Sequence, residues 1–133
     1  MNLKEKIQYW IDLSDYDLET SEAMFTSKRY LYVGFMCHQT IEKILKAYFV
    51  SNNIDNPPYT HNLSYLAEKT GLLDQLTEDQ LLFLDELEPL NIESRYPEHK
   101  DKMLKFLTME KCHVILKKTQ EFQQWIKRKL LKK

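Results

Sequence analysis

Three polar residues at helical spacing give this chain its clearest chemical signal. His38, Glu42 and Lys46 follow one another at intervals of four in a segment that is otherwise largely apolar. Residues four apart share one face of a helix, so these side chains should form a row. A histidine beside a carboxylate can be held in one tautomer with a raised pKa, as in an acid–base pair. The structural alternative is an interhelical hydrogen bond from His38 and a Glu42–Lys46 pair, and spacing alone favours this alternative.

A second chemical signal lies further along the chain, in the sequence RYPEH at residues 95–99. Arginine offers a bidentate fork to phosphate oxygens, and histidine can move a proton near neutral pH. Arg95 and His99 together could promote attack of a ribose 2′-hydroxyl on the neighbouring phosphate without a metal. In the structural alternative, Arg95 pairs with a nearby acidic residue and His99 is exposed in a loop.

The remaining histidines and the two cysteines carry weaker signals. His61 lies at a predicted helix start, where we expect it to cap the helix or to fix the loop before it. Cys37 and His38, with Cys112 and His113, suggest zinc ligands. Adjacent residues on a helix point about 100° apart, however, and chelate poorly as pairs. We therefore expect buried free cysteines, no metal and no cofactor.

Length and composition favour one ordinary globular domain. A chain of 133 residues can bury a real core, so we expect a single domain over residues 1–133. Only two glycines and four prolines occur, which argues against a sheet-rich fold. The formal net charge of −1 gives no strong nucleic-acid signature, and we expect no DNA partner. No apolar run approaches the ~18 residues that span a bilayer, and the N-terminus lacks the apolar core of a signal peptide. We expect a cytoplasmic location and no membrane partner.

Apolar residues recur at three- and four-residue steps along most of the chain, which predicts helices. The first two expected helices cover about residues 3–27 and 30–51. Three more are marked by their start: the third begins at Thr60 or Asn62, the fourth at the capping box of Thr77, and the last at Thr108. The fold class is therefore predicted as all-α, an antiparallel up-and-down bundle of four or five helices.

Glycine and prolines predict where the helical pattern changes. Gly34, inside the second expected helix, predicts close approach of a neighbouring helix. Residues 52–59 hold two prolines and three asparagines and predict a loop. Pro89 should kink or interrupt the fourth helix. Pro97 should mark a further break, followed by a polar link over residues 98–102.

Four segments of the sequence together resemble motifs of the HEPN domain family (higher eukaryotes and prokaryotes nucleotide-binding). The segment HQTIEKILKA at residues 38–47 is similar to that family's HQxxEKxLKA core motif. Residues 60–63 resemble the family's THxL motif, and residues 95–97 resemble its RYP motif. Trp10 and residues 15–18 resemble its first helix. Order and spacing agree in all four, and the resemblance covers essentially the whole chain.

The resemblance implies a helical bundle that commonly forms a homodimer. It also implies a metal-independent ribonuclease activity that many members have, several of them as toxins neutralised by a small nucleotidyltransferase. The family's catalytic signature is an arginine, four to six residues, and then a histidine. Arg95 matches the arginine, whereas His99 follows after three residues and Tyr96 stands where active members often have Asn, Asp or His. Pro97 also disrupts the helix that carries the motif in active members.

These departures favour a non-catalytic module that binds a nucleotide or a partner and works with a nucleotidyltransferase, as in toxin–antitoxin pairs. The candidate binding residues are Arg95, Tyr96, His38, Glu42, Lys46 and His61. The alternative is a homodimeric, metal-independent endoribonuclease toxin that cleaves RNA with Arg95 and His99 from both subunits.

Overall fold

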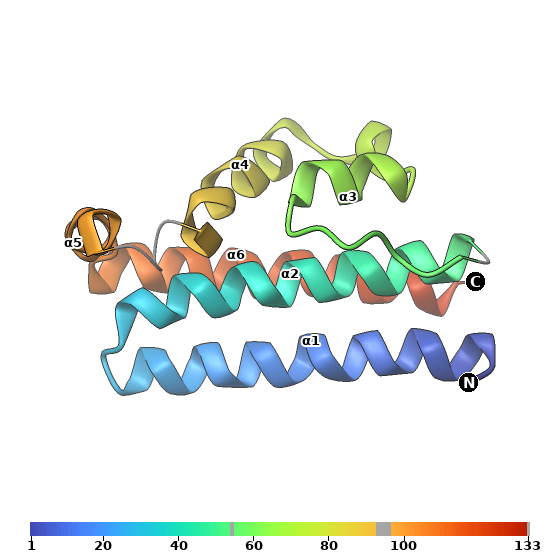
Figure 1. Cartoon of the computed structure of the whole chain (residues 1–133), viewed down its shortest axis with the longest axis horizontal. Helices are drawn as coiled ribbons and strands as arrows, with labels where there is room; N and C mark the ends of the chain where they lie inside the picture. Colours follow the sequence, from blue (N-terminus) through green and yellow to red (C-terminus); the bar gives the residue numbers. More distant parts are fainter. Residues whose placement is uncertain (54, 93–96, 133) are drawn as a thin grey trace.

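Helices make up nearly all of residues 1–53, 55–92 and 97–132, which are the residues that the computed structural model describes. In chain order they are α1 (Leu3–Thr26), α2 (Tyr30–Asn52), α3 (Leu63–Lys69), the short 3₁₀ helix η1 (Leu73–Gln75), α4 (Glu78–Ile92), α5 (Pro97–Phe106) and α6 (Met109–Leu131) (Figure 1). No strand occurs among the described residues, so the all-α prediction is confirmed. None of the helices in these ranges is long and apolar enough to cross a bilayer.

Three long helices form the body of the bundle. α1 runs antiparallel to α2, and α6 lies along α2 on its far side in Figure 1. α3 and α4 cover another side of α2, and α5 lies across the end of the bundle that is opposite both termini (Figure 1). α2 is therefore the central helix, with contacts to α1, α3, α4, α5 and α6. Because neighbours surround it, every residue from Ile44 to Val50 is buried.

The ends of the helices follow the capping residues in the sequence. The side chains of Asn62 and Thr108 each accept the backbone N–H three residues on, at 2.9 and 3.2 Å, and so cap α3 and α6. Thr77 and Gln80 exchange two side-chain-to-backbone hydrogen bonds at 2.9 and 3.1 Å, as a capping box requires. Gly71 has φ +80° shortly after α3, a conformation that favours glycine at a helix end. The three predicted helix starts are confirmed, and Asn62 rather than Thr60 caps α3.

The structure around Pro89 and Pro97 differs from what the sequence predicted. Pro89 was expected to kink or interrupt α4; it lies inside this helix, which continues to Ile92, so an interruption does not occur. The lost backbone hydrogen bond falls near the end of α4, where buried Leu87 and Leu90 hold the helix against the core. Pro97 is the first residue of α5, a position where its missing N–H would have no helical partner. The expected polar link over 98–102 is therefore helical, and the described residues contain six α-helices rather than four or five.

Gly34 lies where α2 meets Leu90 of α4 and Leu107, the residue that follows α5. A Cβ atom added at Gly34 would lie 3.1 Å from Leu90 Cδ1 and 3.2 Å from Leu107 Cδ1. The close approach predicted from the sequence is thus confirmed, and it involves two leucine side chains.

We expect Gly34→Val to lower the free energy of unfolding by about 1–3 kcal/mol, because the added methyl groups must displace both leucines. Urea denaturation followed by circular dichroism measures this change. Tyr32→Val is the matched control, since Tyr32 lies in the same helix with 55% of its surface exposed. The control should change stability by less than about 0.5 kcal/mol apart from helix propensity. Equal stability of the two variants would contradict the role given to Gly34.

Candidate functional site

α2 carries the row of polar residues, which meets α4, the loop before α3 and α1 in turn. His38, Glu42 and Lys46 are exposed by only 0%, 2% and 7%. Lys46 Nζ donates a hydrogen bond to Glu42 Oε2 at 3.0 Å, so the predicted pair one turn apart is confirmed. His38 Nδ1 lies 4.0 Å from Glu42 Oε1, which is beyond hydrogen-bond distance.

His61 comes from the loop before α3 and completes the contacts of Glu42. Its Nδ1 lies 2.7 Å from Glu42 Oε1, so both carboxylate oxygens are engaged, one by His61 and one by Lys46. Burial by itself raises the pKa of Glu42, but the hydrogen bond from His61 and the charge and hydrogen bond of Lys46 outweigh it and hold the pKa below its ordinary value. Glu42 is therefore a charged anchor between α2 and the loop, and the expectation that His61 fixes this loop agrees with the geometry.

Glu88 of α4 is a member of this cluster that sequence reasoning missed. One of its oxygens accepts the backbone N–H of Leu63, the first residue of α3, and the other lies 4.0 Å from His38 Nε2. Burial raises the pKa of Glu88 above its ordinary value, although the backbone N–H groups of Leu63 and Ser64 oppose the rise. The only signal in the sequence was the position of Glu88, one helical turn after the inward-facing Leu84. Because the surrounding segment is generally acidic, Glu88 did not stand out from its neighbours.

His38 is neutral near pH 7 in this environment. Burial lowers its pKa to about 4, and the nearby Glu42 charge raises it only in part. Its Nε2 is a buried atom without a hydrogen-bond partner among the described residues. An acid–base pair would need a raised pKa, so the environment of His38 argues against that pair. No described residue forms the interhelical hydrogen bond of the structural alternative at Nε2 either. We name His38, Glu42, Lys46, His61 and Glu88 the polar cluster.

The second sequence motif is only partly placed. Arg95 and Tyr96 lie outside the described residues. His99 lies in the first turn of α5, so it is helical and not part of the expected loop. Its side chain is partly exposed. α5 occupies the end of the bundle away from both termini (Figure 1).

Both cysteines are buried thiols. Cys37 and Cys112 form no disulfide, and burial raises their pKa values to about 11 and about 12. They are therefore protonated near neutral pH and fit the predicted role of small apolar residues. His113 lies with its ring 6.0 Å from that of Phe25. Within the described ranges, no group of three or more His, Cys, Asp or Glu residues could hold a metal ion.

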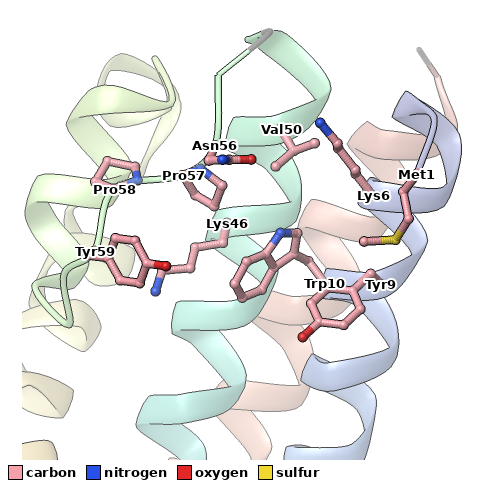
Figure 2. A pocket seen from close by; sticks show the side chains of 10 residues that line it. All are labelled: Met1, Lys6, Tyr9, Trp10, Lys46, Val50, Asn56, Pro57, Pro58 and Tyr59. Carbon is pink, nitrogen blue, oxygen red and sulfur yellow. The ribbon is translucent and has the colours of Figure 1, made fainter.

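An open cavity of about 330 Å³ reaches Lys46 from solvent, between α1, α2 and the loop at residues 56–59 (Figure 2). It is lined by two lysines, three aromatic residues and five others: Lys6, Lys46, Tyr9, Trp10, Tyr59, Met1, Val50, Asn56, Pro57 and Pro58. None of these lining residues is acidic. We call this space the Lys46 cavity. Sequence reasoning missed it because its walls come from three segments that are far apart in the chain.

Comparison with protein families decides what this helical chain is. The model of the HEPN domain matches residues 7–130. The chain belongs to the HEPN family. No curated protein and no solved structure matches it. The suspected resemblance is confirmed, and the all-helical fold agrees with it. In this HEPN domain the core motif joins the central helix to α3 and α4 through the polar cluster, and its last polar residue, Lys46, opens onto a cavity.

Proposed function

We propose that this HEPN domain is a non-catalytic nucleotide-binding module that works with a nucleotidyltransferase partner in a toxin–antitoxin-like pair. One observation carries the proposal: Lys46, the last polar residue of the core motif, lines an open cavity that has no acidic residue on its lining. An anionic ligand entering this cavity meets lysines and aromatic rings, and no carboxylate on the lining opposes it. Nucleotides combine the two features that such walls attract, a negative charge and a planar ring.

The chemistry of the polar cluster supports binding rather than catalysis. A general base must be free to accept a proton from the substrate within hydrogen-bond reach. Both oxygens of Glu42 already accept hydrogen bonds inside the protein. His38 is neutral but has no exposed surface, so a substrate cannot touch it. The cluster therefore holds the wall of the cavity in place and performs no proton transfer on a ligand.

The alternative function is that of a homodimeric endoribonuclease using Arg95 and His99. Partial exposure of His99 on α5 favours this alternative. The same helix exposes Leu104 and Phe106 by 47% and 41%. These apolar side chains would gain by burial in a homodimer formed through α5. Such a dimer would place the two copies of His99 near each other.

The two functions are separated by testing binding and cleavage on the same preparation. We expect calorimetric titration with AMP, GMP, CMP and UMP to give saturable binding of at least one, with Kd below about 1 mM. We expect a labelled RNA incubated with the protein in EDTA to stay intact. Cleavage that is lost in both Arg95→Ala and His99→Ala would establish the ribonuclease instead. Equal cleavage by all three proteins would indicate a contaminating nuclease.

The proposed homodimer and partner have separate tests. Sedimentation velocity should show a dimer at micromolar concentration, and Leu104→Lys, which places a charge on α5, should shift it to monomer. A monomer at all concentrations would count against the dimer. A nucleotidyltransferase gene beside the gene for this chain, and a stable complex on co-expression, would support the partner.

A further inference from the structure

We propose that the Lys46 cavity binds a nucleoside monophosphate, with the base against the open ring of Tyr59 and the phosphate at Lys6. This inference rests on the proposed nucleotide-binding function and assigns it a site and a ligand class. It is argued from the rings, the charges and the size of the cavity.

The ring of Tyr59 is placed to receive a planar group, whereas the ring of Trp10 has the Lys46 ammonium over it. Figure 2 shows Tyr59 and Trp10 on either side of Lys46. The Tyr59 side chain is fully exposed, so its ring offers an open face. Tyr9 packs edge-on against Trp10, with 5.4 Å between ring centroids and an angle of 83°, and so fixes the indole. Nucleobases stack on an open ring such as that of Tyr59 with little dependence on their identity.

The charges of the cavity place the phosphate. Lys46 Nζ is paired with Glu42 and lies 5.5 Å from the centre of the Trp10 ring, so its charge is largely compensated. Lys6 lines the same cavity from α1 and takes part in none of the ion pairs found among the described residues. Of the two lysines on the lining, Lys6 therefore carries the uncompensated positive charge. A phosphate monoester carries a charge of about −1.5 to −2 at neutral pH and would be attracted there.

The volume of the cavity and the rigidity of the loop that forms one of its walls limit the size of the ligand and favour its binding. A volume of about 330 Å³ is at the lower end of the range of about 300–1,000 Å³ typical of small-molecule sites. It suits one nucleoside with one phosphate better than a dinucleotide. The loop that carries Tyr59 is held on both sides, by Pro57 and Pro58 before it and by the His61–Glu42 hydrogen bond after it. The backbone at Tyr59 is thus positioned before a ligand arrives, which lowers the entropic cost of binding.

Tryptophan fluorescence tests the site directly. The chain has two tryptophans, so Trp125→Phe leaves Trp10 as the only reporter. Titration of this variant with AMP should quench the Trp10 emission saturably. Adenosine, which lacks the phosphate, and ribose 5-phosphate, which lacks the base, should each bind at least about 10-fold more weakly, a difference of about 1.4 kcal/mol.

Two substitutions in the same background locate the ligand. Tyr59→Ala and Lys6→Ala should each weaken AMP binding by about 5- to 30-fold. Tyr16→Ala and Lys117→Ala are the matched controls, since both residues are exposed and neither lines the cavity. The controls should bind AMP as the parent does, and thermal melts should show that all four variants fold.

The outcomes distinguish the site from the function. If AMP binds and both cavity variants retain the parent affinity, the cavity assignment is wrong while nucleotide binding stands. If Tyr59→Ala weakens AMP and ribose 5-phosphate equally, the ring does not contact the base and the proposed orientation is wrong. If calorimetry detects no nucleoside monophosphate at all, the cavity assignment and the proposed function both fail.

Discussion

Glu42→Ala is expected to lower the free energy of unfolding by about 3–5 kcal/mol, the largest effect of any single substitution in the polar cluster. The change removes the acceptor of two hydrogen bonds and leaves the ammonium of Lys46, exposed by only 7%, without its counter-charge. It also releases His61, which ties the loop before α3 to α2. Urea denaturation at pH 7, followed by circular dichroism, measures the loss.

A double variant separates the unpaired charge from the lost packing. Glu42→Met combined with Lys46→Met replaces the ion pair by apolar side chains of similar length, a change that is often nearly neutral when both partners go together. We expect it to recover most of the stability lost in Glu42→Ala. A loss below about 1 kcal/mol in Glu42→Ala would show that Lys46 finds solvent through the cavity, contrary to the role given to the pair.

Lowering the pH from about 6.5 to about 4 is expected to cost roughly 3 kcal/mol of stability through His38 alone. The pKa of His38 is lowered to about 4 by burial in the folded state, against an ordinary value of 6.5. Between these two values the unfolded chain binds a proton that the folded protein excludes, so stability falls as the pH falls. No discount for solvent applies, because the side chain has no exposed surface.

The carboxylates of the cluster titrate lower on the pH scale and act in opposite directions. Glu42, with a lowered pKa, adds to the loss as the pH falls below its ordinary value of 4.5. Glu88, with a raised pKa, keeps its proton longer when folded and so opposes the loss just above 4.5.

The comparison that isolates His38 is His38→Gln, measured by thermal and urea unfolding from pH 7 to pH 4.5. The variant should be less stable than the parent at pH 7 and should show a shallower dependence on pH. Its affinity for AMP should remain that of the parent, since His38 does not line the cavity. Parallel pH dependences in the two proteins would show that His38 does not exclude the proton.

The sequence predicted the helices well because their causes are local. Apolar periodicity fixed the long helices, and side-chain caps such as Asn62 and Thr108 fixed where helices begin. The pair of Glu42 and Lys46 was equally predictable, since both residues lie on one helix one turn apart. These features require no knowledge of how distant segments pack.

The features that escaped prediction depend on tertiary packing. α5 was missed because proline was expected only to end a helix, whereas Pro97 begins one. Glu88 carries no local mark, since its role comes from meeting α3 and His38 across the fold. The Lys46 cavity joins α1 to a loop beyond α2, so no spacing between Lys6 and Tyr59 could reveal it.

The polar contacts between α1 and α6 have a consequence for the order of folding. Gln123 of α6 donates to Ser14 and to Asp15 of α1, across more than a hundred residues of chain. α1 and α2, by contrast, are joined by a link of a few residues and have the most extensive contact in the bundle. Local contacts form fastest, so we expect the α1–α2 hairpin to assemble first and to expose its seam with buried Ser14 until α6 docks. During synthesis on the ribosome, the face of the hairpin that α6 covers would stay exposed until α6 has been made. The chain is most prone to aggregation during this interval.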